Sequence, residues 1–257
     1  MKTKQVVFIH GMFVTNKCWD GWVRHFNRSG YNCDAPAWPL KELPPEKLRA
    51  KHPDETGEGK ITLNDVLSSY EKHVSGIARE VVLVGHSMGG LIVQLLLSKG
   101  FGSAGVAIDS APPRGVVTTR FSFVKANWPA LNPFSSPTIP VMLTKRQFQY
   151  AFAHHLNGSA LEEAYKGVVP QSKLVVRGPL TSVAMIDYTQ KKAPLLLIAG
   201  ERDRIVPAPL NESNYKKYSK NSSRTDFIVF PHRTHYLIND ESWQEIADHV
   251  LGWLDKV

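Results

Sequence analysis

The sequence predicts an α/β fold in which helices cover both faces of a mostly parallel sheet. Short apolar runs rich in β-branched residues recur along the chain, and helical patterns separate them. Strands buried on both faces have such continuous apolar runs, and their alternation with helices favours parallel pairing through right-handed crossovers. The 257 residues are 42% hydrophobic and 21% charged, which excludes a mainly disordered or fibrous protein.

The first part of the chain predicts two strands and a helix. The apolar run at residues 6–9 indicates a buried strand that ends at the following His-Gly pair. A helical pattern covers residues 16–29, where apolar side chains recur three and four positions apart, and Gly30 ends it. Residues 32–36 are expected to form a second short strand that runs into a proline-rich loop.

The next part predicts a helix, a strand and a second helix. Thr62 and Asp65 have the spacing of a capping box, which predicts the start of a helix over about 63–76. A buried strand follows at residues 81–84. The helix over residues 91–97 is almost wholly apolar, and a helix that is apolar all round is buried.

Three further strands and a final helix complete the predicted sheet domain. The strands are expected at residues 105–108, 194–199 and 226–230. The last helix is expected to begin at Ser242, with Glu245 at the capping-box position. Its apolar residues share one face, so this helix should seal the sheet.

Between residues 113 and 190 the alternation of strands and helices stops. Aromatic residues and prolines gather there, and the stretch is too long for a structureless loop in a compact domain. We interpret 113–190 as an inserted, mostly helical cap with an aromatic lining, which leaves 1–112 and 191–257 as the core. The alternative is an irregular excursion that packs on the sheet edge and has no role in substrate binding.

A serine motif lies between the predicted strand at 81–84 and the helix that follows it. Residues 85–89 read Gly-His-Ser-Met-Gly and fit the pattern G-x-S-x-G. In this context the serine sits on a sharp turn above the sheet, and side chains in place of the two glycines would collide with flanking strands. The helix N-terminus offers backbone N–H donors to negative charge. Ser87 is therefore the candidate nucleophile, with a purely structural turn as the alternative.

With these motifs the chain resembles the α/β-hydrolase superfamily, close to its single-domain serine esterase and lipase-like branch. The resemblance runs from His10–Phe13 through the serine motif to Gly200–Asp203 and His235. It implies the α/β-hydrolase fold, a mostly parallel central sheet flanked by helices. In that family the early turn and the residue after the nucleophile each donate a backbone N–H to the oxyanion, which here implies the amides of Met12 and Met88.

The nucleophile needs a base, and the base needs an acid that holds it in one tautomer. The superfamily orders these residues as serine, acid, histidine. Asp203 lies in a turn after the strand at 194–199 and matches the family's G-x-x-D turn. Glu201 and Asp109, which also follows a strand, are the rivals for the acid.

His235 is the expected base, because the family places its histidine in a loop just before the final helix. It is followed by an aromatic and an aliphatic residue, as is common there. His232 lies closer to the strand end and is the alternative. The usual glycine before the catalytic histidine is here Thr234, which departs from the family pattern.

The resemblance implies a serine hydrolase that cleaves carboxylic esters through an acyl-enzyme. The aromatic cap favours small to medium apolar acyl or aryl substrates, and Phe13 and Trp128 are candidate pocket walls. The same triad supports lactonase, thioesterase, amidase, perhydrolase, C–C hydrolase or hydroxynitrile lyase activity. A non-catalytic receptor for a small ligand is the alternative from another class. The expected partners are a small-molecule substrate and water, with no metal or cofactor.

Charge and cysteine content narrow the remaining classes of function and the expected compartment. The net charge of +8 suggests nucleic-acid binding, but the basic residues are scattered, which favours a solvated surface. Cys18 and Cys33 have neither a disulfide framework nor a metal-binding spacing, and both are expected to be reduced and structural. The N-terminal apolar run is too short for a signal peptide or a membrane span. We therefore expect a cytoplasmic protein without membrane insertion.

Overall fold

A computed structural model describes residues 4–53, 57–132 and 134–257. Within these residues six strands form one sheet in the order β2-β1-β3-β4-β5-β6, and all neighbouring strands are parallel. The predicted parallel sheet is confirmed. The strands are β1 (Gln5–Ile9), β2 (Asn32–Asp34), β3 (Val81–His86), β4 (Ala104–Ile108), β5 (Leu195–Gly200) and β6 (Thr225–Phe230).

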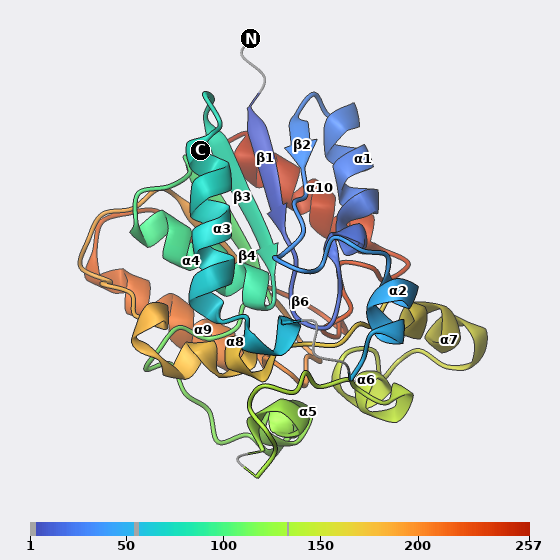
Figure 1. Ribbon diagram of the computed structural model, residues 1–257. Helices are drawn as coiled ribbons and strands as arrows, with labels where there is room; N and C mark the ends of the chain where they lie inside the picture. Colours follow the sequence, from blue (N-terminus) through green and yellow to red (C-terminus); the bar gives the residue numbers. More distant parts are fainter. Residues whose placement is uncertain (1–3, 54–56, 133) are drawn as a thin grey trace.

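Helices cover both faces of this sheet, as Figure 1 shows. The longer ones around the sheet are α1 (Asp20–Arg28), α3 (Leu63–Ser75), α4 (Met88–Ser98), α9 (Ala208–Lys217) and α10 (Trp243–Leu254). α1 and α10 pack together on one face, whereas α3, α4 and α9 contribute to the apolar core on the other. The short helix α2 (Pro45–Ala50) lies in the connection between β2 and α3.

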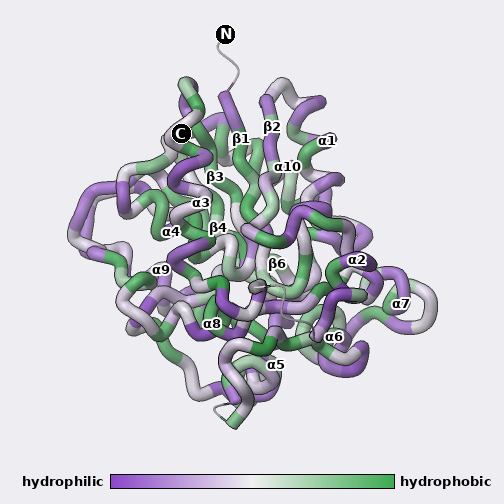
Figure 2. Tube along the Cα trace, in the orientation of Figure 1, coloured by the Kyte–Doolittle hydropathy of each residue, from purple (hydrophilic) through white to green (hydrophobic). Residues whose placement is uncertain are grey.

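The strands are apolar throughout because the sheet separates two cores. In β1, Val7 joins the core under α3 and α4, whereas Phe8 joins the core under α1 and α10. The Phe8 ring packs on the rings of Trp19, Trp22 and Phe26, at centroid distances of 5.0, 6.3 and 5.3 Å. Figure 2 shows the hydrophobic residues along the central strands. Burial on both faces accounts for the continuous apolar runs in the sequence.

The segment 113–190 contains short helices beyond the C-terminal ends of the strands (Figure 1). These helices are α5 (Phe121–Leu131), α6 (Lys145–Ala151), α7 (Gly158–Lys166) and α8 (Lys173–Arg177), followed by 3₁₀ turns at Gly178–Leu180 and Ser182–Ala184. The carboxyl ends of parallel strands are where α/β folds place their sites. The segment thus lies over the edge that carries the serine motif, while its status as a separate cap stays a prediction.

A buried ion pair ties the segment after β2 to this region. The Lys41 ammonium donates a hydrogen bond to the carbonyl of Pro170 and lies 2.7 Å from the Glu58 carboxylate. Burial lowers the pKa of Lys41, while the charge of Glu58 acts in the opposite direction. Because loss of Glu58 would leave Lys41 as an unpaired buried charge, the pair holds the Lys41 ammonium where it contacts Pro170.

Of the two predicted capping boxes, one forms and one does not. At the start of α3, the Thr62 hydroxyl accepts a hydrogen bond from the Asp65 amide at 3.2 Å, and the Asp65 carboxylate accepts one from the Thr62 amide at 2.8 Å. The prediction at α10 was wrong. Arg233 donates to the Ser242 hydroxyl and, at 2.5 Å, to the Glu245 carboxylate, so a cation from the preceding loop occupies both capping groups.

Both cysteines are free thiols and partly buried, as predicted. Burial raises the pKa of Cys33 to about 12, and it also raises the pKa of Cys18. Neither thiol is therefore a reactive thiolate at neutral pH. In the part of the chain that the structure describes, no helix is both long and apolar enough to span a bilayer.

Replacing Gly89 by alanine is expected to destabilise the fold. A Cβ there would lie 2.1 Å from the carbonyl oxygen of Ile9, so α4 would be pushed away from β1. Overpacking of this kind costs about 1–3 kcal/mol. Gly252→Ala in α10 is the matched control, because nothing lies within 4 Å of its added Cβ. That change should raise the free energy of unfolding by about 0.5–1 kcal/mol.

Urea denaturation followed by circular dichroism measures both free energies of unfolding. A Gly89→Ala protein as stable as the parent would contradict the close approach of α4 to β1.

Candidate active site

Ser87 occupies a strained turn between β3 and α4. Its backbone angles are φ 58° and ψ −121°, a conformation that a residue with a side chain rarely adopts. The end of β4 holds it there. The Ser87 amide donates to the Ile108 carbonyl at 2.9 Å, and the Ser87 carbonyl accepts from the Ala111 amide at 2.9 Å. Strain of this kind persists only where the surroundings impose it, and it is typical of active sites.

The turn after β1 touches this serine directly. A Cβ on Gly11 would lie 2.8 Å from the Ser87 Cβ and 3.0 Å from the His86 carbonyl oxygen. Only glycine therefore allows the two turns to approach this closely. The approach brings the backbone of the next residue, Met12, beside the serine, and the Met12 side chain lines the same cavity as Ser87.

His10 holds the peptide group that joins Gly11 to Met12. Its Nδ1 donates to the Gly11 carbonyl at 2.9 Å, and its Nε2 accepts from the Trp38 amide at 3.2 Å. The His10 ring stacks on Trp38 at a centroid distance of 4.7 Å. Burial lowers the pKa of His10 to about 3, so the ring stays neutral. Because a peptide group is planar, anchoring the Gly11 carbonyl also sets the direction of the Met12 N–H.

The two amides expected to hold an oxyanion are unoccupied donors. Neither the Met12 nor the Met88 N–H donates to any residue that the structure describes. Met88 is the first residue of α4, where N–H groups lack partners within the helix. Both residues line one cavity together with Ser87, so both amides can be directed at a ligand there.

His235 and Asp203 form a buried hydrogen-bonded pair. The His235 Nδ1 donates to the Asp203 carboxylate at 2.6 Å, and neither side chain is accessible to solvent. The other carboxylate oxygen of Asp203 accepts from the amides of Ile205 and Val206 at 2.6 and 2.9 Å. With Nδ1 protonated, the Nε2 of His235 is left as the basic nitrogen, which is the tautomer that a general base requires.

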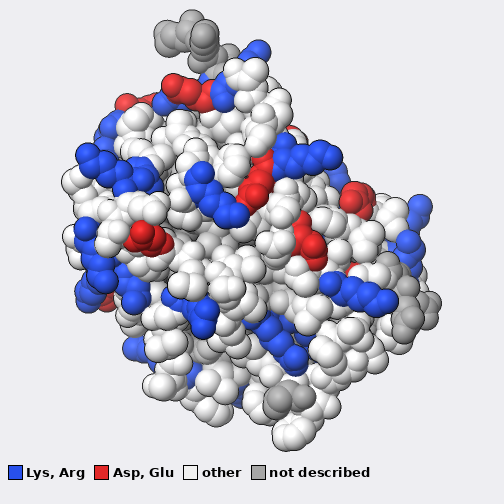
Figure 3. All heavy atoms as spheres, turned by 60° about the vertical axis from the view of Figure 1, so that its left-hand side comes forward, with Lys and Arg blue, Asp and Glu red and all other residues white. Residues whose placement is uncertain are grey.

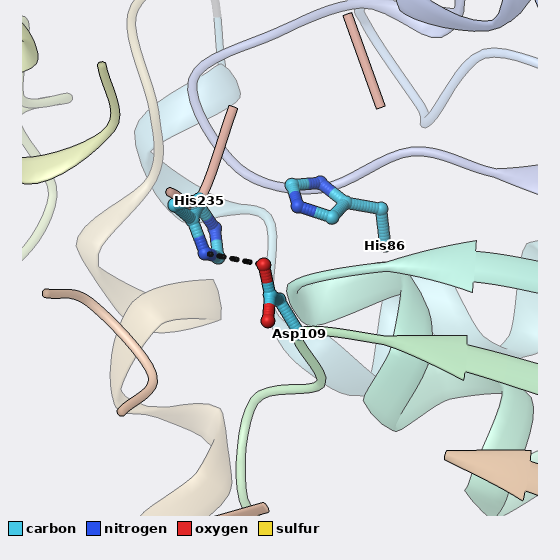
Figure 4. Close-up of side chains that lie close together, drawn as sticks. All are labelled: His86, Asp109 and His235. Atoms are coloured by element: carbon cyan, nitrogen blue, oxygen red, sulfur yellow. Dashed lines mark ion pairs between the residues drawn. The ribbon is translucent and has the colours of Figure 1, made fainter. Parts of the chain in front are cut away.

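Asp109 approaches the same histidine but has a different role. Figure 4 shows it directed at the His235 ring, and its carboxylate lies 3.9 Å from Nδ1, too far for a hydrogen bond. Its other oxygen accepts from the Gly200 amide at 2.7 Å. Burial and the neighbouring Asp203 raise the pKa of Asp109 well above its usual range. A protonated Asp109 can donate to Asp203, whereas two buried carboxylates side by side would repel each other.

His86, the residue before Ser87, packs against the His235–Asp203 pair. Its ring centroid lies 4.5 Å from that of His235, and burial lowers its pKa, so it is neutral. Ligand atoms of His86, Asp109 and His235 lie within 4.8 Å of one another, a spacing that a metal could use. However, the His235 nitrogen that faces Asp109 is Nδ1, which carries the proton donated to Asp203 and so has no lone pair for a metal. The arrangement therefore favours a hydrogen-bond network over a metal site.

The Nε2 of His235 is buried and has no hydrogen-bond partner among the described residues. It therefore does not bond the Ser87 hydroxyl in this structure. In active sites without substrate, catalytic hydrogen bonds are often long and tighten only when substrate binds. The His235 ring contacts the ring of His86, the residue that directly precedes Ser87 in the chain.

Two cavities meet at this site. One, of about 380 Å³, contains Ser87 and has a mostly apolar wall that includes Val116, Phe123 and Leu210. The other, of about 470 Å³, contains His86 and His235 and is bounded by Phe148, Phe152 and Tyr236 as well as by charged residues. Met12 lines both cavities, so the second begins where the first ends.

The structure separates the remaining predicted residues from the site. His232 and Glu201, the rival base and acid, bind each other at the surface, where the His232 amide donates to the Glu201 carboxylate at 2.8 Å. Phe13 is buried and packs on Phe152, and Trp128 lines a different groove. Neither is among the residues that line the Ser87 or the His235 cavity, so their role as pocket walls stays a prediction.

Sequence reasoning missed two residues that contact His235. Phe152 packs edge-on against its ring at a centroid distance of 5.1 Å, and Asp109 was weighed only as a rival acid, not as a partner of the acid. The aromatic cluster and the position after β4 were visible signals, but neither indicated which histidine they would contact.

Comparisons with known proteins agree with this architecture. The sequence profile of the alpha/beta hydrolase family matches residues 6–249. No curated protein matches the sequence. Similar solved structures include a pyrethroid hydrolase from Sphingobium faniae JZ-2, with 15% identity, a TM-score of 0.68, and coverage of 98% of this chain and 97% of that one.

Two other similar structures differ from that hydrolase in their described activity. One is a monoacylglycerol lipase from Paleococcus ferrophilus, with 18% identity, a TM-score of 0.66, and coverage of 97% of this chain and 93% of that one. The other is tomato methylketone synthase I complexed with 2-tridecanone, with 18% identity, a TM-score of 0.69, and coverage of 100% and 99%. At these identities the structures confirm the predicted fold class.

Proposed function

The chain belongs to the alpha/beta hydrolase family, and we propose that it is a serine hydrolase that cleaves carboxylic esters through an acyl-enzyme. One observation carries the proposal. Ser87 lies at a strained turn on the wall of an apolar cavity, and the preceding residue, His86, packs on the ring of the buried His235–Asp203 pair. A nucleophile, a base and an acid that orients the base are the parts that acyl transfer requires.

In the proposed reaction, the Ser87 hydroxyl attacks the ester carbonyl while the Nε2 of His235 takes its proton. Asp203 stabilises the imidazolium that forms, and the amides of Met12 and Met88 hold the oxyanion. His235 then gives the proton to the leaving alcohol. It next takes a proton from water, which attacks the acyl-enzyme, and it gives this proton to the Ser87 Oγ as the acid is released. No other reactant is required.

The two cavities suggest how the ester is oriented. The leaving alcohol must depart next to His235, because that residue protonates it, so the alcohol belongs in the cavity of about 470 Å³. The acyl group belongs in the apolar cavity of about 380 Å³ at Ser87. Residues of the proposed cap wall both cavities, Phe123 and Leu180 in the acyl cavity and Phe148 and Phe152 in the alcohol cavity. This favours an apolar acyl group longer than acetyl.

Labelling with a fluorophosphonate and a panel of esters tests the proposal. We expect one equivalent of label at Ser87, identified by peptide mass spectrometry. We also expect a higher kcat/KM for p-nitrophenyl butyrate or hexanoate than for p-nitrophenyl acetate. Thioesters, lactones and p-nitroanilides are assayed in the same panel. Their rates reveal whether the protein prefers another acyl bond to an ester. A protein that is neither labelled nor active on any of these would be a binding protein instead.

A further inference from the structure

Helix α5 is apolar on two faces although it lies at the surface. Its outer side exposes Phe121, Val124 and Trp128, whose side chains are 76%, 43% and 51% accessible and are spaced along one helical stripe. Its inner side places Phe123 and Leu131 in the wall of the Ser87 cavity. A helix that is hydrophobic all round is normally buried, so the outer stripe lacks a partner.

Two further exposed apolar residues lie at the mouth of the Ser87 cavity. Val117 and Leu180 both line that cavity, and their side chains are 81% and 70% accessible. Isolated exposed apolar residues are ordinary, but contiguous ones mark interaction sites. The entrance to the proposed acyl cavity is therefore framed by apolar side chains that face solvent.

The segment that carries this surface has charged residues of a single sign. Residues 110–161 contain no Asp or Glu, whereas they contain five Lys and Arg residues. Lys145 pairs with Glu162, and the other four form no ion pair with any described residue. In Figure 3 the lower end of the molecule, where Figure 1 places α5, shows uncharged and basic residues and no acidic ones. The four unpaired cations are Arg114, Arg120, Lys125 and Arg146.

Two of these cations lie in a groove between α5 and α6. The groove encloses about 670 Å³, and its wall combines Phe121 and Trp128 with Lys125, Arg146 and Tyr150. The Lys125 ammonium lies 4.1 Å from the centre of the Tyr150 ring. Aromatic side chains at the water interface beside Lys and Arg form the combination that binds anionic lipid surfaces.

We propose that the surface formed by Phe121, Val124, Lys125, Trp128 and Arg146, the docking face, binds the surface of an anionic lipid bilayer. Its apolar side chains would enter the headgroup region while the two cations pair with lipid phosphates. The lack of acidic residues favours this partner over a protein surface of mixed charge. Binding itself does not depend on Ser87. Docking would present lipid esters to the mouth of the Ser87 cavity, and this role rests on the proposed esterase function.

Sedimentation with lipid vesicles tests the proposal. The parent protein should sediment with vesicles of phosphatidylglycerol and phosphatidylcholine in equal amounts, and much less with phosphatidylcholine alone. Phe121→Ser combined with Trp128→Ser should abolish this binding. Lys125→Gln combined with Arg146→Gln should weaken it by about fivefold for each cation removed. The matched control, Arg28→Gln with Lys220→Gln, removes two exposed cations that precede β2 and β6, at the opposite edge of the sheet.

The outcomes separate docking from catalysis. A Ser87→Ala protein should bind vesicles like the parent, so an inactive enzyme that still binds leaves the docking proposal intact and overturns only the proposed function. Docking would be refuted by a parent that stays in solution with phosphatidylglycerol, or by equal losses in the docking-face and control pairs. It would also be refuted if light scattering showed a parent dimer that Phe121→Ser with Trp128→Ser dissociates, because a second copy would then cover the face.

Discussion

A Ser87→Ala protein is expected to retain its fold and to lose about 10⁶ in kcat for p-nitrophenyl esters. The loss follows because the nucleophile disappears, while the amides of Met12 and Met88 still bind the carbonyl. The Ser87 hydroxyl makes no hydrogen bond to any residue that the structure describes, and backbone contacts to Ile108 and Ala111 hold the turn. Initial rates at saturating ester, together with a circular dichroism spectrum, measure both parts of the prediction.

Ser219→Ala serves as the matched control, because it removes an exposed hydroxyl in the 3₁₀ turn at Tyr218–Lys220. It should label with fluorophosphonate and turn over esters at the parent rate. If folded Ser87→Ala hydrolysed esters as fast as the parent, the acyl-enzyme mechanism would be excluded for this protein.

An Asp203→Asn protein is expected to lose about 10⁴ in kcat, as happens when the acid of such a triad becomes an amide. The amide can donate a hydrogen bond to the His235 Nδ1, which favours the tautomer with the proton on Nε2. That tautomer cannot accept the proton of Ser87. Asp203 also accepts hydrogen bonds from the backbone amides of Ile205 and Val206. Thermal stability should therefore be measured alongside kcat.

The matched change Asp109→Asn distinguishes the two aspartates. Burial and the charge of Asp203 raise the pKa of Asp109 well above its usual range, which favours the neutral acid, and the asparagine amide that replaces it is also neutral. We expect kcat to stay within about tenfold of the parent, because a positioning residue costs less than the acid itself. The opposite ranking, with the larger loss in Asp109→Asn, would reassign the triad acid to Asp109.

Asp109→Asn also has a signature in stability that a merely structural residue would not produce. Because its pKa is raised in the folded state, Asp109 ionises in the unfolded chain at a lower pH than in the fold. Its contribution to stability is full below the ordinary aspartate pKa and is lost as the pH rises towards the raised value, by about 1.4 kcal/mol per pH unit. Urea denaturation across this range should show that slope in the parent and a smaller one in Asp109→Asn.

Local patterns predicted most of the sheet domain because they depend on neighbours in sequence. The apolar runs became strands, and the capping box at Thr62 formed between residues three positions apart. The box at Ser242 failed because Arg233, from outside the helix, bound both of its side chains. The individual helices of 113–190 could not be delimited, because short helices draw their stability from tertiary packing rather than from their own sequence.

By itself the sequence determined the order of strands and helices and the position of Ser87. Both follow from hydrophobic periodicity and from the glycines that a strained turn between a strand and a helix requires. Only the tertiary structure decided that Asp203, rather than Asp109, bonds His235, and that Trp128 faces outward. Distances between side chains from separate segments settle such questions, and a difference of about an ångström between two carboxylates leaves no trace in the spacing of residues along the chain.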